Sequence, residues 1–516
     1  MNLHDTPITA LGASGLARAI AAGDIGALEA TEAQIEQLEK ANAPLNAITV
    51  RRYDAARAEA RTIDARRARG EALPPLAGVP ITVKDSLDLA GLPSTFGLPW
   101  RRDLLADSDE PHIARLRAAG AIALAKTNVA QLLLSYESNN PLWGRTNNPF
   151  SAERAPGGSS GGEAALIAAG GSLLGIGTDI GGSVRVPAHA CGIAAFKPTT
   201  GRCDDPGAYS VPVGQRAIRS QIGPLARRVD DLVLAMRHLP AGPEDGVPAL
   251  GDVDAVDLSR LRVAWFDDDG EFPAAPACRR AVREAAQALA RAGATVVPLP
   301  PFPFSRLFDL AFELWTADGG HAVQAALRGG PVDPNLKTLL MLAQMPRVLQ
   351  PLMRAALHAA GQPSMARIMG HTGWTRVRDH WPRVQELVEL QRDCLRRLDR
   401  ADGGAIDLVL APPCALPAFR HGLARDLGLA GVYAVAANAL GWPAGAVPWT
   451  RVRPGEESDR PVSRDRIQAL AREVERGSAG LPIGVQVIGR PWRDHQVLAA
   501  MRALEGLAPA PPEPTA

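Results

Sequence analysis

The stretch from residue 155 to 201 reads APGGSSGGEAALIAAGGSLLGIGTDIGGSVRVPAHACGIAAFKPTTG. Four Gly-Gly pairs stand in it, at 157–158, 161–162, 170–171 and 181–182. Glycine at this density lets successive backbone N–H groups turn toward a ligand. Two serines, Ser159 and Ser183, lie 24 residues apart in these glycine-rich loops. A serine hydroxyl is a weak nucleophile without a base, so the stretch predicts a catalytic site that needs a base from elsewhere in the chain.

Three common glycine motifs do not account for this stretch. A phosphate-binding loop requires a Gly-Lys pair, which is absent here. A dinucleotide fingerprint requires GxGxxG, and the run 175–181 has one residue too many. The nucleophile-elbow pattern GxSxG does match residues 158–162, but the elbow must follow an apolar strand. The preceding residues 148–156 contain Pro149 and Pro156, which a central strand does not accommodate.

Lys84 is the best candidate for the base. It ends the apolar run Val79–Val83, where burial would lower the pKa of its amine and leave it neutral. Only five of the 56 basic residues are lysines, and arginine cannot lose its proton in the same way. The residues alone leave open a second interpretation, in which Lys84 only pairs with the adjacent Asp85.

The composition is that of a globular protein. The 516 residues carry a net charge of +1, with 46% hydrophobic and 22% charged residues. This excludes a disordered or collagen-like chain and a strongly basic nucleic-acid binder. No run of eighteen apolar residues and no secretory signal is visible, and the five cysteines form no CxxC pair. We therefore expect a cytoplasmic protein with no nucleic-acid partner, no metal site and no cofactor.

Short apolar runs alternate with helical patterns along most of the chain, which predicts an α/β fold with a mainly parallel or mixed sheet. The predicted strands are residues 79–83, 121–125, 263–266, 295–298, 406–410, 444–448 and 483–488. We expect three parts: a helical N-terminal segment at 1–70 packed on the core, a main domain at 71–506, and a disordered, proline-rich tail at 507–516.

The segment 157–199 closely resembles the signature of the amidase signature hydrolases. The flanks agree as well: GVPITVKDSLDLAG at 78–91, NALGWPAGAVP at 438–448 and GLPIGVQVIGRPWRD at 480–494. The resemblance covers residues 12 to 506. It implies the fold of that family, a large twisted mixed β-sheet covered by helices on both faces.

The resemblance also implies a catalytic triad. Ser183 matches the nucleophile, Ser159 the bridging serine that follows a cis peptide bond, and Lys84 the base. The expected donors to the oxyanion are the backbone N–H groups of Ile180, Gly181, Gly182 and Ser183. Asp179 and Arg185 flank the nucleophile, and we interpret them as a structural pair that holds the loop.

Within the family the chain most resembles the fatty-acid amide hydrolases, for example in SYESNNPLWGRTNNP at 135–149. This similarity favours hydrophobic acyl amides as substrates, of the fatty-acid amide or N-acylethanolamine type. The candidate substrate-binding residues are Leu133, Leu134, Tyr136 and Trp492. Three alternatives remain: an amidase of small aliphatic, aryl or urea-like amides, the glutaminase subunit of a tRNA-dependent amidotransferase, and a non-catalytic binding module. That glutaminase subunit carries an acidic residue at the position that Gly431 occupies here, seven residues before Asn438.

Residues 334–378, which we call the cap segment, differ from the rest of the chain. They hold five of the eight methionines and six basic residues, but no Asp or Glu. Such cationic, Met-rich helices suit a membrane surface or a lid over an apolar ligand. A helical pair packed on the protein's own core, or at a homodimer interface, remains open. We expect peripheral membrane contact through this segment.

Overall fold

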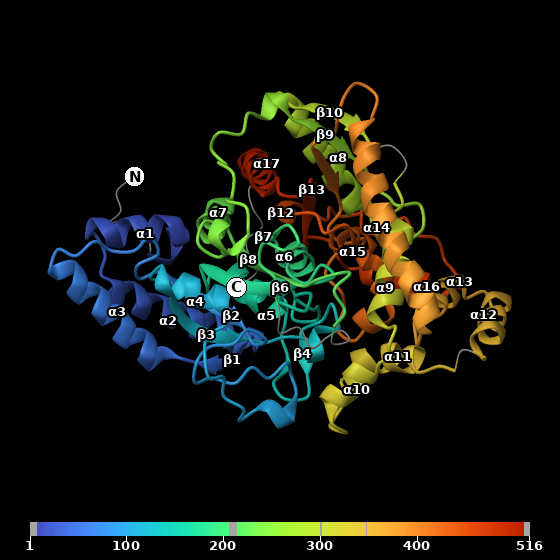
Figure 1. The fold of residues 1–516 in the computed structure, drawn as a ribbon, viewed down its shortest axis with the longest axis horizontal. Helices are drawn as coiled ribbons and strands as arrows, with labels where there is room; N and C mark the ends of the chain where they lie inside the picture. The colour runs from blue at the N-terminus through green and yellow to red at the C-terminus, as the bar shows by residue number, and fades with distance from the viewer. Residues whose placement is uncertain (1–7, 206–213, 300–301, 347, 510–516) are drawn as a thin grey trace.

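An eleven-stranded mixed sheet runs through the molecule (Figure 1). The computed structural model describes residues 8–205, 214–299, 302–346 and 348–509. The strand order is β1-β3-β2-β6-β8-β7-β12-β13-β11-β9-β10. The bounds are β1 Ile48–Arg51, β2 Pro80–Lys84, β3 Ile122–Thr127, β6 Leu174–Asp179, β7 Ala194–Lys197, β8 Gln221–Ala226, β9 Arg262–Trp265, β10 Thr295–Pro298, β11 Leu408–Ala411, β12 Ala444–Arg451 and β13 Pro482–Gly489. Strands pair in parallel near both ends of the sheet (β3-β2-β6 and β11-β9-β10) and antiparallel between them.

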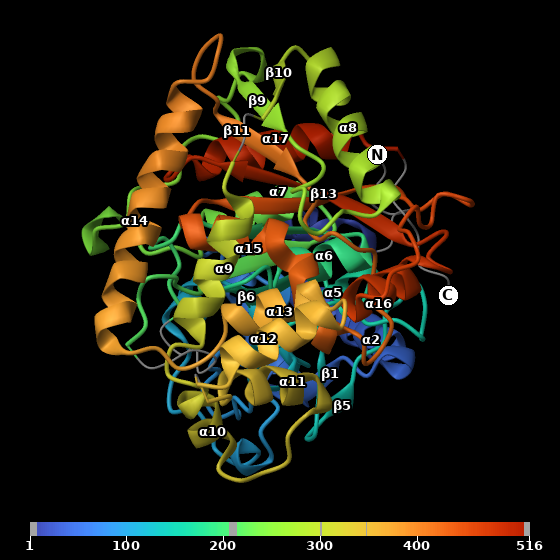
Figure 2. The same cartoon turned by 90° about the vertical axis from the view of Figure 1, so that its right-hand side faces the viewer.

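Helices cover both faces of this sheet. Helices α5 and α6 pack on one face, and α7 and α17 pack on the opposite face (Figures 1 and 2). The helices are α1 Gly12–Ala22, α2 Ala27–Leu45, α3 Tyr53–Ala68, α4 Pro111–Ala118, α5 Gly161–Ala168, α6 Arg185–Cys191, α7 Val229–Met236, α8 Pro276–Arg291, α9 Phe304–Trp315, α10 His321–Leu327, α11 Pro334–Ala343, α12 Gln350–Ala359, α13 Pro363–Gly370, α14 Val377–Asp399, α15 Val432–Leu440, α16 Arg466–Glu475 and α17 Asp494–Leu507. The predicted α/β class is confirmed.

All seven predicted strands are present, with ends shifted by a few residues, but four strands of the large sheet were missed. Strand β6 is the most important of them, because its sequence LGIGTD looks like a loop. Its glycines make room for α5. A Cβ on Gly175 would lie 2.1 Å from Glu163 Oε2, and one on Gly177 would lie 2.7 Å from Ser160 Oγ. Close helix–strand packing therefore explains why a buried strand here is rich in glycine.

The N-terminal segment is not purely helical. Strand β1 lies between α2 and α3 and pairs antiparallel with β3, so this segment supplies one edge of the sheet. At the other end of the chain, α17 ends at Leu507, and residues 510–516 of the predicted tail lie outside the described residues.

The cap segment forms the three short helices α11, α12 and α13, which lead into α14 (Figure 2). Helix α12 packs against α13, and none of its residues is buried. In the part of the chain that the structure describes, no helix combines the length and the apolar character needed to cross a bilayer.

Candidate active site

Lys84 is the last residue of β2, and every residue of this strand is buried. Its Nζ lies 2.8 Å from Ser159 Oγ, 2.8 Å from Thr178 Oγ1 and 3.4 Å from the Thr178 carbonyl oxygen. The adjacent Asp85 instead accepts hydrogen bonds from Thr95 and from the Phe96 N–H. Side chains of consecutive residues in extended backbone point to opposite faces, so the side chains of Lys84 and Asp85 point in opposite directions. The interpretation of Lys84 as the simple ion-pair partner of Asp85 is therefore wrong.

Burial changes the proton affinity of this amine. It lowers the pKa of Lys84 from 10.5 to about 7, although nearby carboxylates, among them Asp179 and Glu163, oppose the shift. A neutral amine has one lone pair and two N–H groups. The two N–H groups can donate to the hydroxyl and carbonyl of Thr178, and the lone pair can then accept the hydroxyl proton of Ser159. The environment thus suits a base that works near neutral pH.

Ser159 follows a cis peptide bond at Gly158–Ser159, as the family resemblance implied. The loop before it is tightly enclosed, because a Cβ on Gly158 would lie 2.2 Å from the Ser135 carbonyl oxygen. Ser159 itself is fully buried. Its neighbour Ser160 donates its backbone N–H to the Ser183 carbonyl oxygen at 3.1 Å. This hydrogen bond joins the two serine loops, although they lie far apart in sequence.

Ser183 lies in the short loop between β6 and α6, with 6% of its surface exposed. Parallel pairing of β2 with β6, at Val83 and Ile176, brings the end of the lysine strand beside the end of the serine strand. Lys84, Ser159 and Ser183 therefore lie near the carboxyl ends of the neighbouring strands β2 and β6.

The loop around Ser183 rests on a buried ion pair. Asp179 and Arg185 are fully buried and lie 2.9 Å apart. Asn438 donates to Asp179, and Gln486 accepts from Arg185. Burial opposes ionisation of Asp179, but the Arg185 charge and the hydrogen bonds from Arg185 and Asn438 hold the pKa of Asp179 well below its usual range. These contacts tie the loop that carries Ser183 to α15 and β13.

The expected set of oxyanion donors needs one correction. The Gly182 N–H donates to Asp179 Oδ1 at 2.8 Å, so it is already used inside the loop. The other three residues, Ile180, Gly181 and Ser183, all line a cavity, and within the described chain no acceptor is recorded for their N–H groups. Sequence reasoning missed this difference because consecutive N–H groups in a loop look equivalent in a sequence.

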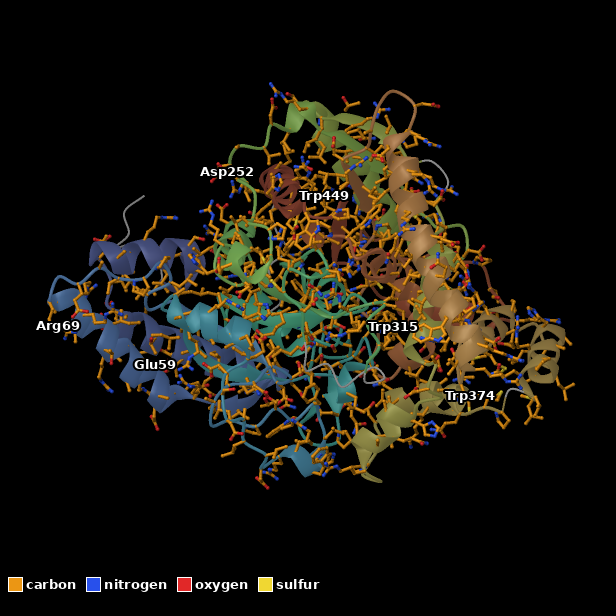
Figure 3. All side chains as sticks on the ribbon, viewed as in Figure 1. Glu59, Arg69, Asp252, Trp315, Trp374 and Trp449 are labelled. Atoms are coloured by element: carbon orange, nitrogen blue, oxygen red, sulfur yellow. The ribbon has the colours of Figure 1, made fainter. Side chains whose placement is uncertain are left out.

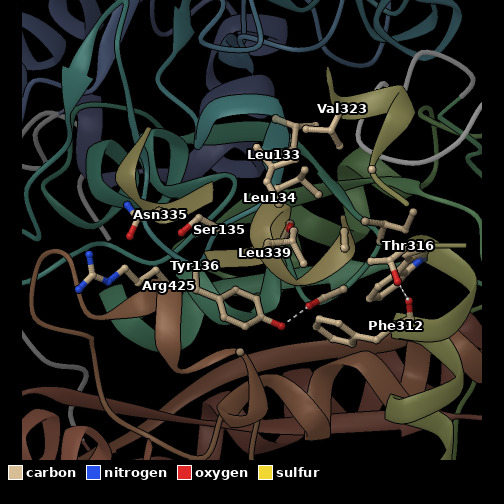
Figure 4. A pocket seen from close by; sticks show the side chains of 18 of the residues that line it. Leu133, Leu134, Ser135, Tyr136, Phe312, Thr316, Val323, Asn335, Leu339 and Arg425 are labelled. Carbon is tan, nitrogen blue, oxygen red and sulfur yellow. Dashed lines mark hydrogen bonds between the residues drawn. The ribbon is translucent and has the colours of Figure 1, made fainter. Parts of the chain in front are cut away.

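The cavity that reaches Ser183 has a volume of about 170 Å³ and is mostly apolar (Figure 4). Three of the candidate substrate-binding residues, Leu133, Leu134 and Tyr136, line it. The sequence analysis missed most of the remaining wall. It comes from α9, the 316–323 region, α11 and the 424–435 region, and includes Phe312, Trp315, Thr316, Val323, Asn335, Leu339, Leu340, Ala343, Arg425 and Val435. The cap segment therefore contributes to this cavity through α11.

The structure does not bring Trp492 to this cavity. Its indole lies under the Arg202 guanidinium, 5.1 Å from carbon to ring centroid, and is 39% exposed. Its backbone N–H donates to Thr199 Oγ1 at 2.9 Å. Trp492 therefore differs from the other three candidate substrate-binding residues, which line the cavity.

Comparisons with known proteins agree with this geometry. The family model described as Amidase matches residues 29–498. Fatty-acid amide hydrolase 1 from Sus scrofa is 34% identical over 446 residues, covering 84% of this chain and 76% of that protein. Fatty acid amide hydrolase 1 from Caenorhabditis elegans is 32% identical over 494 residues, covering 94% and 86%.

Solved structures show the same similarity. A structure titled "Fatty acid amide hydrolase" has a TM-score of 0.84 and 25% identity, over 97% of this chain and 85% of that chain. A bacterial aryl acylamidase has a TM-score of 0.68 and 25% identity, over 96% of each chain. The chain belongs to the amidase signature family. It is a serine amidohydrolase, an enzyme that hydrolyses amide C–N bonds.

Proposed function

We propose that this amidase cleaves amides of hydrophobic acyl groups, such as fatty-acid amides or N-acylethanolamines, through Ser183, Ser159 and Lys84. The observation that carries the proposal is the apolar cavity that reaches Ser183 between Leu133, Leu134 and helix α11. Apolar walls of this kind favour a hydrocarbon chain by removing it from water. Relatives named fatty-acid amide hydrolase support the same substrate class.

The reaction begins with a proton relay. Neutral Lys84 accepts the hydroxyl proton of Ser159 across their 2.8 Å contact, while Ser159 accepts the proton of Ser183. Ser183 Oγ then forms a bond to the amide carbonyl carbon, and the carbonyl oxygen becomes an oxyanion. The N–H groups of Ile180, Gly181 and Ser183 are the donors that stabilise this charge, and loss of one such donor typically costs about 3–4 kcal/mol.

Collapse of the tetrahedral intermediate requires protonation of the leaving amine. The proton returns from Lys84 through Ser159 to the amide nitrogen, and the C–N bond breaks. The acyl group remains on Ser183 as an ester. Water then attacks this ester with the same relay as base, the carboxylic acid leaves, and Ser183 regains its proton.

Two features weigh against the alternative functions. The glutaminase subunit of an amidotransferase needs an acidic side chain at the position of Gly431, where a Cβ would lie 2.0 Å from the Tyr136 hydroxyl. No such side chain fits there. An amidase of small or aryl amides remains the second candidate, since an aryl acylamidase shares the fold. The extent of the apolar wall favours the longer acyl chain.

The test is a series of amides from acetyl to oleoyl, assayed with the purified chain alone. Each methylene that enters the cavity contributes about 0.8 kcal/mol, so kcat/KM should rise about fourfold per carbon until the cavity is full. Rates confined to short acyl groups would favour the small-amide alternative. Absence of activity without partner proteins would favour the amidotransferase.

Substitutions test the chemistry independently of the substrate. Ser183→Ala should abolish turnover, and Lys84→Ala should reduce kcat by about 10⁴-fold, the upper end for a lost general base. Substantial activity in Lys84→Ala would show that another group is the base. Thr199→Ala is a suitable control, because this buried threonine pairs with Asp494 and not with Lys84.

We also propose that the enzyme is cytoplasmic and touches a lipid surface through the cap segment. Large apolar side chains are exposed there, including Val348 (85%), Leu352 (69%) and Val377 (71%), and Trp381 (64%) is exposed just beyond the segment in α14. Figure 3 places Trp374 at this edge of the molecule and Trp315 nearer its centre. The cap segment carries six basic residues and no acidic residue, a charge that suits an anionic lipid surface.

Co-sedimentation with vesicles tests this surface. Binding to anionic phospholipid vesicles should weaken in Leu352→Glu and at high salt. A homodimer that dissociates in Leu352→Glu, without vesicle binding by the native chain, would instead identify the patch as a subunit interface.

A further inference from the structure

The peptide between Gly181 and Gly182 is held from both sides. The Tyr136 hydroxyl donates to the Gly181 carbonyl oxygen at 2.7 Å, a bond drawn in Figure 4. On the other edge of the same peptide, the Gly182 N–H donates to Asp179 Oδ1 at 2.8 Å. Two hydrogen bonds to opposite edges fix the rotation of a peptide plane about the chain axis.

This peptide needs such support because both residues that it joins are glycines. Gly182 has φ of +101°, a region that is open to glycine and restricted for other residues. Without a side chain at either residue, little steric resistance opposes rotation of the peptide. The orientation of this plane affects the direction of the neighbouring N–H groups of Gly181 and Ser183, two residues that line the cavity.

Tyr136 is itself fixed in place. Its ring stacks on Phe419 with an interplanar angle of 4° and a centroid distance of 6.2 Å. Gly431 passes close to the hydroxyl, so no other side chain can enter between them. Burial raises the pKa of Tyr136 well above its usual value, and the hydroxyl keeps its proton to donate throughout the working range of pH. A rigid donor is well suited to orient a flexible glycine loop.

We propose that Tyr136 is a positioning residue that pre-organises the oxyanion site through the Gly181 carbonyl. The inference rests on the proposed serine mechanism and adds a residue to it. Tyr136 acts on the transition state by holding the donors where the charge develops, rather than by transferring a proton. Its contribution should therefore appear in kcat and in the affinity for an oxyanion, and not in substrate binding.

Tyr136→Phe tests this directly, because phenylalanine keeps the stacked ring and removes only the hydroxyl. We expect kcat to fall about tenfold, part of the 10²–10³-fold loss that removal of a whole oxyanion donor causes, with KM changed less than twofold. An aldehyde analogue of the substrate forms a hemiacetal with Ser183 that carries the oxyanion. Its affinity should fall by the same factor as kcat.

Two controls make the result specific. Tyr433→Phe also removes a buried tyrosine hydroxyl, one that bonds to the 269–272 loop, and should leave kcat unchanged. Titration of reactive Ser183 with a fluorophosphonate counts the folded sites, so a poorly folded variant does not imitate a lower kcat. The midpoint of the pH–rate profile should not move, because Tyr136 does not contact Lys84.

The outcomes separate this inference from the proposed function. If Ser183→Ala retains turnover, the serine mechanism itself is wrong. If Ser183→Ala is inactive but Tyr136→Phe keeps native kcat and aldehyde affinity, only the positioning role is wrong. A rise in KM at constant kcat, or a displaced pH midpoint, would also overturn it, since either would assign Tyr136 to substrate binding or to the base.

Discussion

In the proposed mechanism, the pH dependence of catalysis follows the protonation of Lys84. Burial lowers its pKa to about 7, and only the neutral amine can accept the proton of Ser159. At pH 7 about half of the molecules then hold a neutral amine, whereas an exposed lysine would be neutral in about one molecule in 3,000. The structure thus increases the active fraction about a thousandfold. Below pH 7, kcat/KM should fall tenfold per pH unit, to about 1% of its maximum at pH 5.

Thr178→Val changes this midpoint in a defined direction. Thr178 Oγ1 lies 2.8 Å from Lys84 Nζ and accepts from the protonated amine, so it stabilises the charged form. A hydrogen bond to a charged group contributes about 1.5–3 kcal/mol, equivalent to about one to two pKa units. The backbone carbonyl of residue 178, which lies 3.4 Å from Lys84 Nζ, is unchanged in Thr178→Val. We therefore expect a pKa shift near the lower end of this range. The pKa of Lys84 should fall by about one unit, and the activity profile should move to lower pH.

The assay is kcat/KM between pH 5 and 9 with a soluble chromogenic acyl anilide, in buffers of constant ionic strength. Thr199→Val serves as the matched control, because Thr199 is equally buried but bonds to Asp494, and its midpoint should stay near 7. A profile without an inflection in this range, or a shift of the Thr178→Val midpoint to higher pH, would refute the role of Lys84 as the titrating base.

Two further predictions concern stability and specificity. Asp179→Asn leaves the fully buried Arg185 without its charge partner and should lower the free energy of unfolding by about 3–5 kcal/mol in urea titrations; a loss below 1 kcal/mol would contradict the structural role of the pair. Phe312 and Leu339 both line the cavity at Ser183 and a second cavity of about 50 Å³ behind them. Phe312→Ala should join the two cavities and move the preferred acyl chain to greater length by at least about two methylenes, each worth about 0.8 kcal/mol; an unchanged optimum in the acyl series would contradict this.

Much of the fold could be predicted from local patterns. The seven predicted strands are apolar runs whose composition differs from that of the helices around them, and two of them, β2 and β13, are buried along their whole length. Strand β6 could not be recognised in this way. Its glycines reflect the close approach of Glu163 in α5 and of Ser160 just before that helix, which is a contact between segments and leaves no periodic pattern. Strand β1 was missed because its four residues lie between two long helices.

Some residues of the candidate site could likewise be recognised from the sequence, and others could not. Lys84, Ser159 and Ser183 could be selected by residue type and motif, because their chemistry requires a lysine in an apolar run and serines in glycine-rich loops. Thr178 and Asn438 could not be selected by residue type, since they act through hydrogen bonds to Lys84 and Asp179 that form only in the folded chain. Trp492 was selected because it is a large aromatic residue near a matching motif, but its ring contacts Arg202 and it does not line the cavity at Ser183.

The sequence alone therefore determined the family and the α/β class and selected the three candidate catalytic side chains, because these depend on residue identity and on order along the chain. Only the tertiary structure decided which N–H groups are free to meet an oxyanion, which walls form the apolar cavity, and that Tyr136 reaches the Gly181 carbonyl. Each of these depends on contacts between segments that lie tens to hundreds of residues apart. Such contacts arise when the strands pair and the helices pack, and short-range patterns in the sequence do not record them.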